Sequence, residues 1–161
     1  MIKICFDSSA LGKLLDLPLL DSKNFLATDR LLKSMINNRK NFDLFISPVF
    51  ITELIAAPSK IRTATAIMIK KLNMSIIPTN PQAESLAKFY LQQKVLPKNS
   101  LLDLLHIAYA SIAECDFLLS FDNHFLREKT VNLVSKINRE QNIFVPKIIS
   151  PLTFLEQWEK K

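Results

Sequence analysis

The chain has 161 residues, 48% of them hydrophobic, which is an ordinary length for one domain with a single core. No apolar run approaches the ~20 residues of a membrane-spanning helix and no signal-like segment follows Lys3, so we expect a cytoplasmic protein without a membrane segment. Cys5 and Cys115 lack the spacing of a zinc or redox motif and are expected to be buried free thiols, while the net charge of +6 favours an anionic partner.

Short apolar runs alternate with helical patterns along the chain. Residues 2–6 predict a buried strand, which ends at Asp7-Ser8-Ser9, where side chains can cap a helix. The later elements are, in chain order, a helix over 25–36 after a connection that contains Pro18, a strand over 43–47, helices over 50–56 and 61–72, an extended segment over 75–78, helices over 82–93 and 101–113, strands over 117–121 and 147–149, and a helix over 152–158. This alternation predicts one α/β domain over residues 1–161, a three-layer α/β/α sandwich with a mainly parallel central sheet.

Four acidic residues fall where such a sheet binds ligands. Asp7 and Asp122 follow predicted strands, at the carboxyl edge where the strand order reverses. Glu53, on the helix just after the second predicted strand, and Asp103, on the helix just before the strand that ends at Asp122, can project toward the same edge. Carboxylates that share a crevice must take up protons or bind a cation, and an all-oxygen set suits Mg²⁺ or Mn²⁺. The single glycine, Gly12, excludes the glycine-rich loops that cradle nucleotide phosphates.

These acids lie in segments that resemble the motifs of the PIN domain family, which includes VapC-type toxins. The matching segments are Ile4-Cys5-Phe6-Asp7-Ser8-Ser9, residues 47–53, Asp103-Leu104-Leu105-His106-Ile107-Ala108 and Ser120-Phe121-Asp122. The resemblance implies a ribonuclease that depends on Mg²⁺ or Mn²⁺ and uses water as the nucleophile. It also implies that Asp7, Glu53, Asp103 and Asp122 hold the metal, and that a cognate antitoxin and a homodimer are the expected partners beside RNA.

Each of these residues also has a simpler interpretation. Asp7 and Asp122 could be helix caps, and Glu53 could be an exposed helical residue. His106, on the same helix face as Asp103, is interpreted as a packed histidine rather than a catalytic base. The remaining polar neighbours, Ser8, Ser120 and Asn123, are expected to orient the carboxylates. The family often has Thr at the position of Ser8, and Asn123 could share the role of Asp122.

Two rival functions remain beside the nuclease. One is a catalytically silent PIN-like module that binds RNA or a partner protein. The other, a phosphate hydrolase with Asp7 as nucleophile, is less favoured because Ser9 stands where a second Asp is usual. Basic residues gather in 23–40 and 60–71, and these stretches are either solvated helix faces or surfaces that hold the RNA backbone.

Overall fold

A five-stranded parallel sheet forms the middle of the computed structural model, which describes residues 1–12 and 23–160. The expected connection around Pro18 lies outside these residues. The strands are β1 (Ile2–Phe6), β2 (Phe42–Ile46), β3 (Ser75–Ile76), β4 (Phe117–Leu119) and β5 (Lys147–Ile149), in the order β3-β2-β1-β4-β5. Chain order therefore runs outward from β1 to β3 and then returns to β4, so the reversal lies between β1 and β4.

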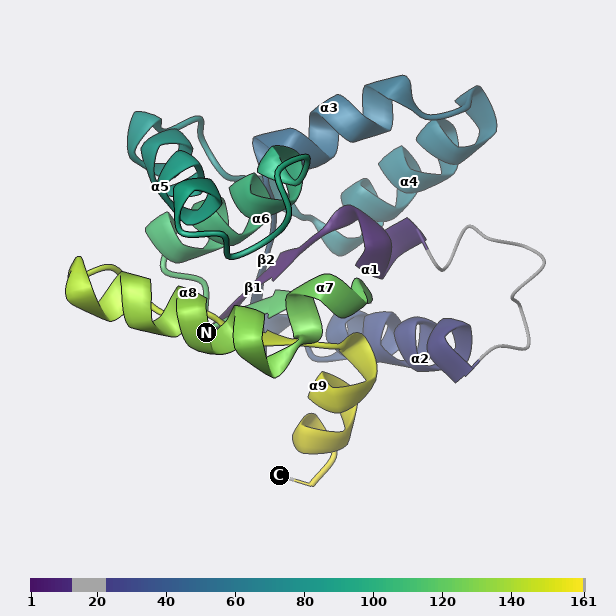
Figure 1. Cartoon of the computed structure of the whole chain (residues 1–161). Helices are drawn as coiled ribbons and strands as arrows, with labels where there is room; N and C mark the ends of the chain where they lie inside the picture. Colours follow the sequence, from purple (N-terminus) through teal and green to yellow (C-terminus); the bar gives the residue numbers. More distant parts are fainter. Residues whose placement is uncertain (13–22, 161) are drawn as a thin grey trace.

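Helices cover both faces of this sheet, as the sequence predicts. They are α1 (Ser8–Gly12), α2 (Lys23–Asn37), α3 (Pro48–Ala56), α4 (Ser59–Leu72), α5 (Pro81–Gln92), α6 (Leu101–Ile112), α7 (Asn123–Leu126), α8 (Glu128–Glu140) and α9 (Pro151–Trp158), with a short 3₁₀ turn over Arg39–Asn41. Figure 1 shows the strands in the middle, with α5 and α6 on one side and α2 and α9 on the other. In the part of the chain that is described, no helix combines the length and apolarity needed to cross a bilayer.

Successive residues of β1 belong to two different cores. Ile4 and Phe6 pack with α2, α4 and α9, whereas Cys5 packs with α5, α6 and α8. A strand that is buried on both faces needs a continuous apolar run, which explains the sequence of residues 2–6. Cys5 and Cys115 are both buried free thiols, as predicted. The predicted three-layer sandwich is confirmed.

Two differences from the predicted elements affect the site. The strand predicted over 117–121 stops at Leu119. The N–H of Ser120 still donates to the carbonyl of Ile149 in β5, but the N–H of Phe121 donates to the Ser9 hydroxyl rather than to a neighbouring strand. Helices α7 and α8 were not predicted, although both pack into the core that contains Cys5. The early end of β4 places Ser120 beside the end of β1, and α7 begins directly after Asp122.

Candidate functional site

Asp7 is a buried carboxylate held by hydrogen bonds at the carboxyl edge of the sheet. Its side chain is only 4% exposed. It accepts hydrogen bonds from the hydroxyls of Ser9, at 2.8 and 3.0 Å, and Ser120, at 2.5 Å, and from the N–H of Ala10 at 2.9 Å. Burial raises the pKa of Asp7, although the charge of His106 and these hydrogen bonds oppose the rise. The fold therefore keeps one acidic group fixed in a nearly dry position.

The pairing of β1 with β4 brings Ser120 to Asp7. Phe6 lies opposite Leu119 in the parallel register, so the next residue of each strand meets at the sheet edge. Ser9 adds a second link between the strand ends, because its hydroxyl lies 3.2 Å from that of Ser120. Ser120 has the orienting position that the sequence predicts. Ser9 was missed as a site residue, and its signal was its position two residues after the strand-end acid.

His106 is buried between α3 and α6 and fixes Glu53. Its Nε2 lies 3.2 Å from Glu53 Oε2, and its Nδ1 lies 2.9 Å from the hydroxyl of Ser47. Since a carboxylate only accepts, Nε2 is the donor to Glu53. Ser8 also donates to Glu53. Burial alone would raise the pKa of Glu53, but the hydrogen bonds from His106 and Ser8 outweigh it and lower the pKa.

The interpretation of His106 as a packed, hydrogen-bonded histidine thus agrees with the structure, and it orients Glu53 as well. Ser8 touches Glu53, whereas the sequence associated it with Asp7 and the helix start. Ser47 was missed in this role. It is the N-cap of α3, where its hydroxyl accepts from the N–H of Phe50, and only the packing of α3 against α6 brings it to His106.

Asp103 is the acidic group with the fewest partners. It lies in the first turn of α6 and is half-buried. Burial and then repulsion from Asp122 and Glu53 raise its pKa, against the opposing charges of His106 and His124. Within residues 1–12 and 23–160, no hydrogen bond or ion pair holds its carboxylate. Asp103 is therefore a carboxylate whose negative charge is still to be balanced.

Asp122 is the N-cap of α7. Its Oδ1 accepts from the N–H of His124 at 2.7 Å, and its own N–H donates to the hydroxyl of Ser120 at 2.9 Å. Asp122 is therefore a helix cap, as one interpretation of the sequence holds. A second role is compatible with the cap, because the charge of Asp122 also raises the pKa of Asp103. Asn123 is exposed, and in the described residues its side chain makes no hydrogen bond.

The four acids suit a divalent cation in their chemistry but do not form a ready cage. Their oxygen donors are those that Mg²⁺ and Mn²⁺ prefer, and Asp103 has a charge that a cation would balance. In residues 1–12 and 23–160, no three acidic, histidine or cysteine side chains are arranged to hold a metal ion. Binding would therefore require these side chains to come closer together than they are here.

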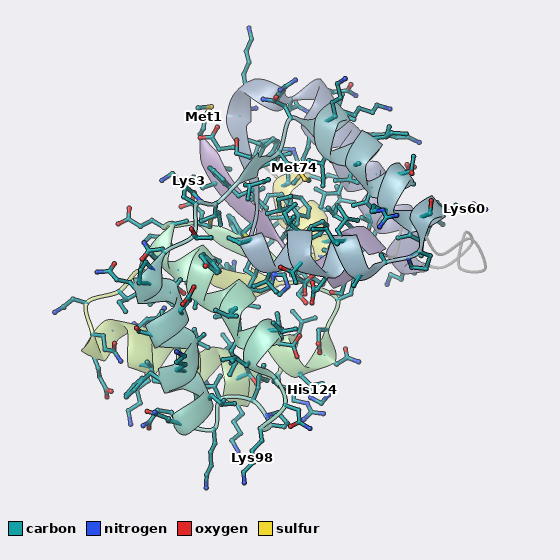
Figure 2. The ribbon with its side chains drawn as sticks, turned by 90° about the horizontal axis from the view of Figure 1, so that it is seen from above. Met1, Lys3, Lys60, Met74, Lys98 and His124 are labelled. Carbon is teal, nitrogen blue, oxygen red and sulfur yellow. The ribbon has the colours of Figure 1, made fainter. Side chains whose placement is uncertain are left out.

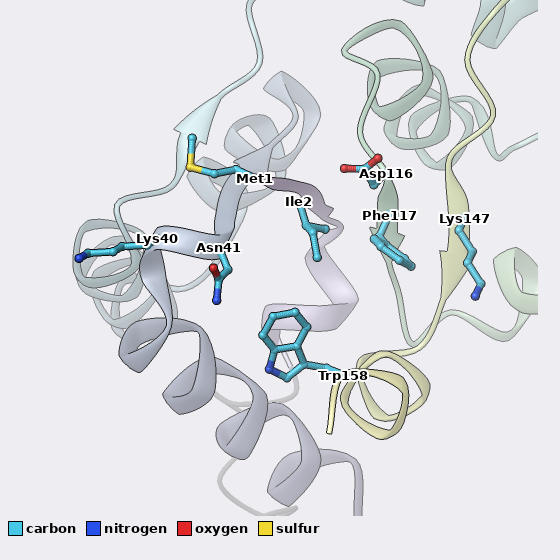
Figure 3. A pocket seen from close by; sticks show the side chains of 8 residues that line it. All are labelled: Met1, Ile2, Lys40, Asn41, Asp116, Phe117, Lys147 and Trp158. Carbon is cyan, nitrogen blue, oxygen red and sulfur yellow. The ribbon is translucent and has the colours of Figure 1, made fainter. Parts of the chain in front are cut away.

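A cavity of about 730 Å³ lies at the amino edge of the sheet, opposite these acids. Figure 3 shows it between the start of β1, the start of β4 and Trp158 of α9. Its one acidic side chain is Asp116, which accepts from the N–H of Lys3 at 2.8 Å. Asp116 is the turn residue that the sequence predicts. This cavity offers no second group of acids.

Comparisons with known proteins agree with the motifs. The sequence model of the PIN domain family matches residues 4–129. Among solved structures, the chain is similar to the crystal structure of VapBC2 from Rickettsia felis bound to a DNA fragment from their promoter. The TM-score is 0.57 and the sequence identity is 18%, and the match covers 80% of this chain and 95% of that chain. This likeness concerns the fold. No curated protein matches the sequence.

Proposed function

Because the chain belongs to the PIN domain family, we propose that it is an endoribonuclease that depends on Mg²⁺ or Mn²⁺ and hydrolyses RNA phosphodiester bonds. We further propose that it is the toxin of a type II toxin–antitoxin pair. The net charge of +6 supports a polyanionic substrate. The fold shared with VapBC2 supports an antitoxin partner. We expect a small reading frame beside the gene to encode this antitoxin. A gene without such a neighbour would contradict the proposed toxin–antitoxin pair.

The observation that carries the proposal is the position of Asp103. Its carboxylate faces the repulsion of Asp122 and Glu53 and forms no ion pair in residues 1–12 and 23–160, and it lies at the edge where open parallel sheets bind ligands. A purely structural acid in a half-buried helix would be expected to pair with Lys or Arg. An unbalanced cluster of acids at this edge is suited to a cation and the phosphate that it binds.

In this mechanism the protein holds acids in place and water attacks the phosphorus. Asp7, Glu53, Asp103 and Asp122 would hold the cation. A bound Mg²⁺ or Mn²⁺ would supply a Lewis acid for the phosphate and a water of lowered pKa. Ser9 and Ser120 keep Asp7 fixed, and His106 and Ser8 keep Glu53 oriented. The four-acid arrangement needs no nucleophilic side chain.

Cleavage of total bacterial RNA by matched variants tests the proposal. Wild type, Asp7→Asn, Asp103→Asn and Glu114→Gln are compared with Mg²⁺, with Mn²⁺ and with EDTA. Glu114 is the control because it is exposed and lies beyond the end of α6 that is far from Asp103. Its substitution by Gln removes one negative charge, as the Asp variants do. We expect wild type and Glu114→Gln to cleave only with a divalent cation, and both Asp variants to lose at least about 100-fold, as when one group of a catalytic unit is removed. Equal rates in all four proteins would disprove the nuclease.

The catalytically silent module remains a second candidate, because the acids do not form a ready cage. Thermal unfolding during a Mn²⁺ titration separates the two functions. A cation that binds the folded protein stabilises it by about 2.7 kcal/mol at a hundred times its Kd, which corresponds to a rise in Tm of roughly 5–10 °C for this size.

We expect this rise in wild type and not in Asp103→Asn. In EDTA the order reverses and Asp103→Asn melts higher, because the variant lacks the repulsion from Asp122 and Glu53. A Tm of wild type that stays constant over the whole titration, in a protein that still binds RNA, would favour the silent module.

A further inference from the structure

A cleft of about 670 Å³ lies between the α5–α6 connection and the α7–α8 region. Positively charged groups line both of its walls: Lys94 and Lys98 on one, and Arg127 and Lys129 on the other, with His124 at the start of the second. No acidic side chain is among its lining residues. Figure 2 shows Lys98 and His124 on the same side of the molecule, away from Lys60 of α4.

The cations of this cleft are free of internal partners. Some surface cations of the described residues form ion pairs, such as Arg30 with Glu159 and Lys33 with Asp29. Many others in that part of the chain form none. The four Lys and Arg side chains of the cleft belong to this second group, since they are exposed and make no ion pair or side-chain hydrogen bond within residues 1–12 and 23–160, and they also share one cleft. Like charges brought together without acids repel one another and attract an anion. The arrangement differs from an ordinary solvated face of mixed charge.

The cleft adjoins the acidic site at two points. His124 lies two residues after Asp122, and its N–H donates to that carboxylate at 2.7 Å. On the other wall, Lys98 lies in the turn that leads into α6, where the N–H of Ser100 donates to Pro97 and Asp103 follows in the first turn of the helix. A polyanion bound along the cleft would therefore reach the acids at one end.

The floor of the cleft is apolar. Val95 and Leu96 are buried, and Leu91 and Pro97 continue the surface beside them. Phosphates would contact the charged walls, but an apolar floor suits the faces of unstacked bases. A duplex keeps its bases stacked inside and offers only its backbone and groove edges. No Phe, Tyr or Trp side chain lines the cleft, so binding should depend on charge far more than on base identity.

We propose that this cleft binds a single-stranded stretch of RNA next to the phosphate that is cut. The proposal rests on the proposed nuclease and assigns the path of its substrate, with Lys98 and Arg127 as the contacts from the two walls. Because of its apolar floor, the cleft should bind a single strand of RNA more tightly than a duplex.

Binding of fluorescein-labelled RNA in EDTA tests the path without requiring cleavage. The probes are a short mixed-sequence single strand and the duplex of the same sequence. The double variant Lys98→Gln/Arg127→Gln is compared with Lys60→Gln/Lys70→Gln, which removes the same charge from exposed positions on α4. All four side chains are exposed, and unchanged thermal unfolding would verify the folding of both variants.

We expect the cleft variant to bind the single strand at least about tenfold more weakly at roughly 100 mM salt, and its log–log salt slope to fall by about 1.4, or about 0.7 for each lost phosphate contact. The α4 variant should stay within twofold of wild type. Equal weakening by both pairs, unchanged binding by the cleft variant, or duplex binding as tight as single-strand binding would overturn the proposal.

The two proposals fail in distinguishable ways. If Asp103→Asn abolishes cleavage while the cleft variant binds and cuts like wild type, the nuclease stands and this path is wrong. If the cleft variant alone loses binding but wild type cuts with neither Mg²⁺ nor Mn²⁺, the path stands as that of a binding module.

Discussion

Tyr90 shows how single residues of this chain bury polar groups. Its ring is fully buried, and its hydroxyl donates to Asn138 Oδ1 at 2.5 Å. The Asn138 amide donates in turn to the hydroxyl of Ser111 at 3.0 Å and to the carbonyl of Phe144 at 2.7 Å. Every polar atom of this group therefore has a partner. Burial raises the pKa of Tyr90 to about 12, and its hydrogen bonds with Ser111 and Asn138 offset only part of this rise.

This shift gives a prediction for alkaline pH. A folded pKa above the ordinary value of 10 means that the stabilisation is complete below pH 10 and is lost as pH rises toward 12. Over this window wild type should lose roughly 2–3 kcal/mol that Tyr90→Phe does not lose, at about 1.4 kcal/mol for each pKa unit. At neutral pH Tyr90→Phe should be less stable by about 1–3 kcal/mol, because Asn138 Oδ1 loses its donor.

Urea unfolding followed by the fluorescence of Trp158 measures both effects. Tyr109→Phe is the matched control, since Tyr109 is also buried and makes no hydrogen bond through its hydroxyl in the described residues. Parallel stability curves for wild type and Tyr90→Phe between pH 9 and 12 would contradict the assigned cause.

Sequence could find the acids of the site but not their partners. Asp7 and Asp122 were identifiable because each ends an apolar run, and Asp103 because it interrupts an apolar helix. The contacts of His106 with Ser47 and Glu53 join residues 59 and 53 positions apart. The spacing of residues along one helix cannot reveal a contact with another helix, so the orienting role of His106 appeared only in the folded chain.

At the level of elements, the buried strands and apolar helices were predictable, with ends shifted by at most two residues. Helix α8 was missed because it is largely polar. Val131, Val134 and Ile137 form a narrow stripe that recurs every three residues, and this stripe is the signal that would have revealed it. Helix α7 has only four residues and depends on the cap that Asp122 provides, so its sequence holds too little pattern to predict it.

At the scale of the whole molecule, the three layers were predictable from the sequence, because apolar strands that are buried on both faces alternate with helices.

The expected homodimer stays a prediction. Ile55 of α3 and Leu102 of α6 are 65% and 51% exposed, on helices that contact one another, and they offer apolar surface beside the acids. Light scattering should give twice the mass of one chain at micromolar concentration. A single-chain mass at every concentration would exclude the dimer.

The position of β1 as the central strand of the sheet affects how the protein folds during translation. After β1 has been made, its neighbour β2 follows some forty residues later, but the Ser120 partner of Asp7 follows only after 113 residues. Domains whose pairings are this distant in sequence fold late. A partly made chain therefore lacks the complete acidic edge, and if the protein cuts RNA, the ribosome that is translating it is spared until the segment that carries Ser120 has also been made.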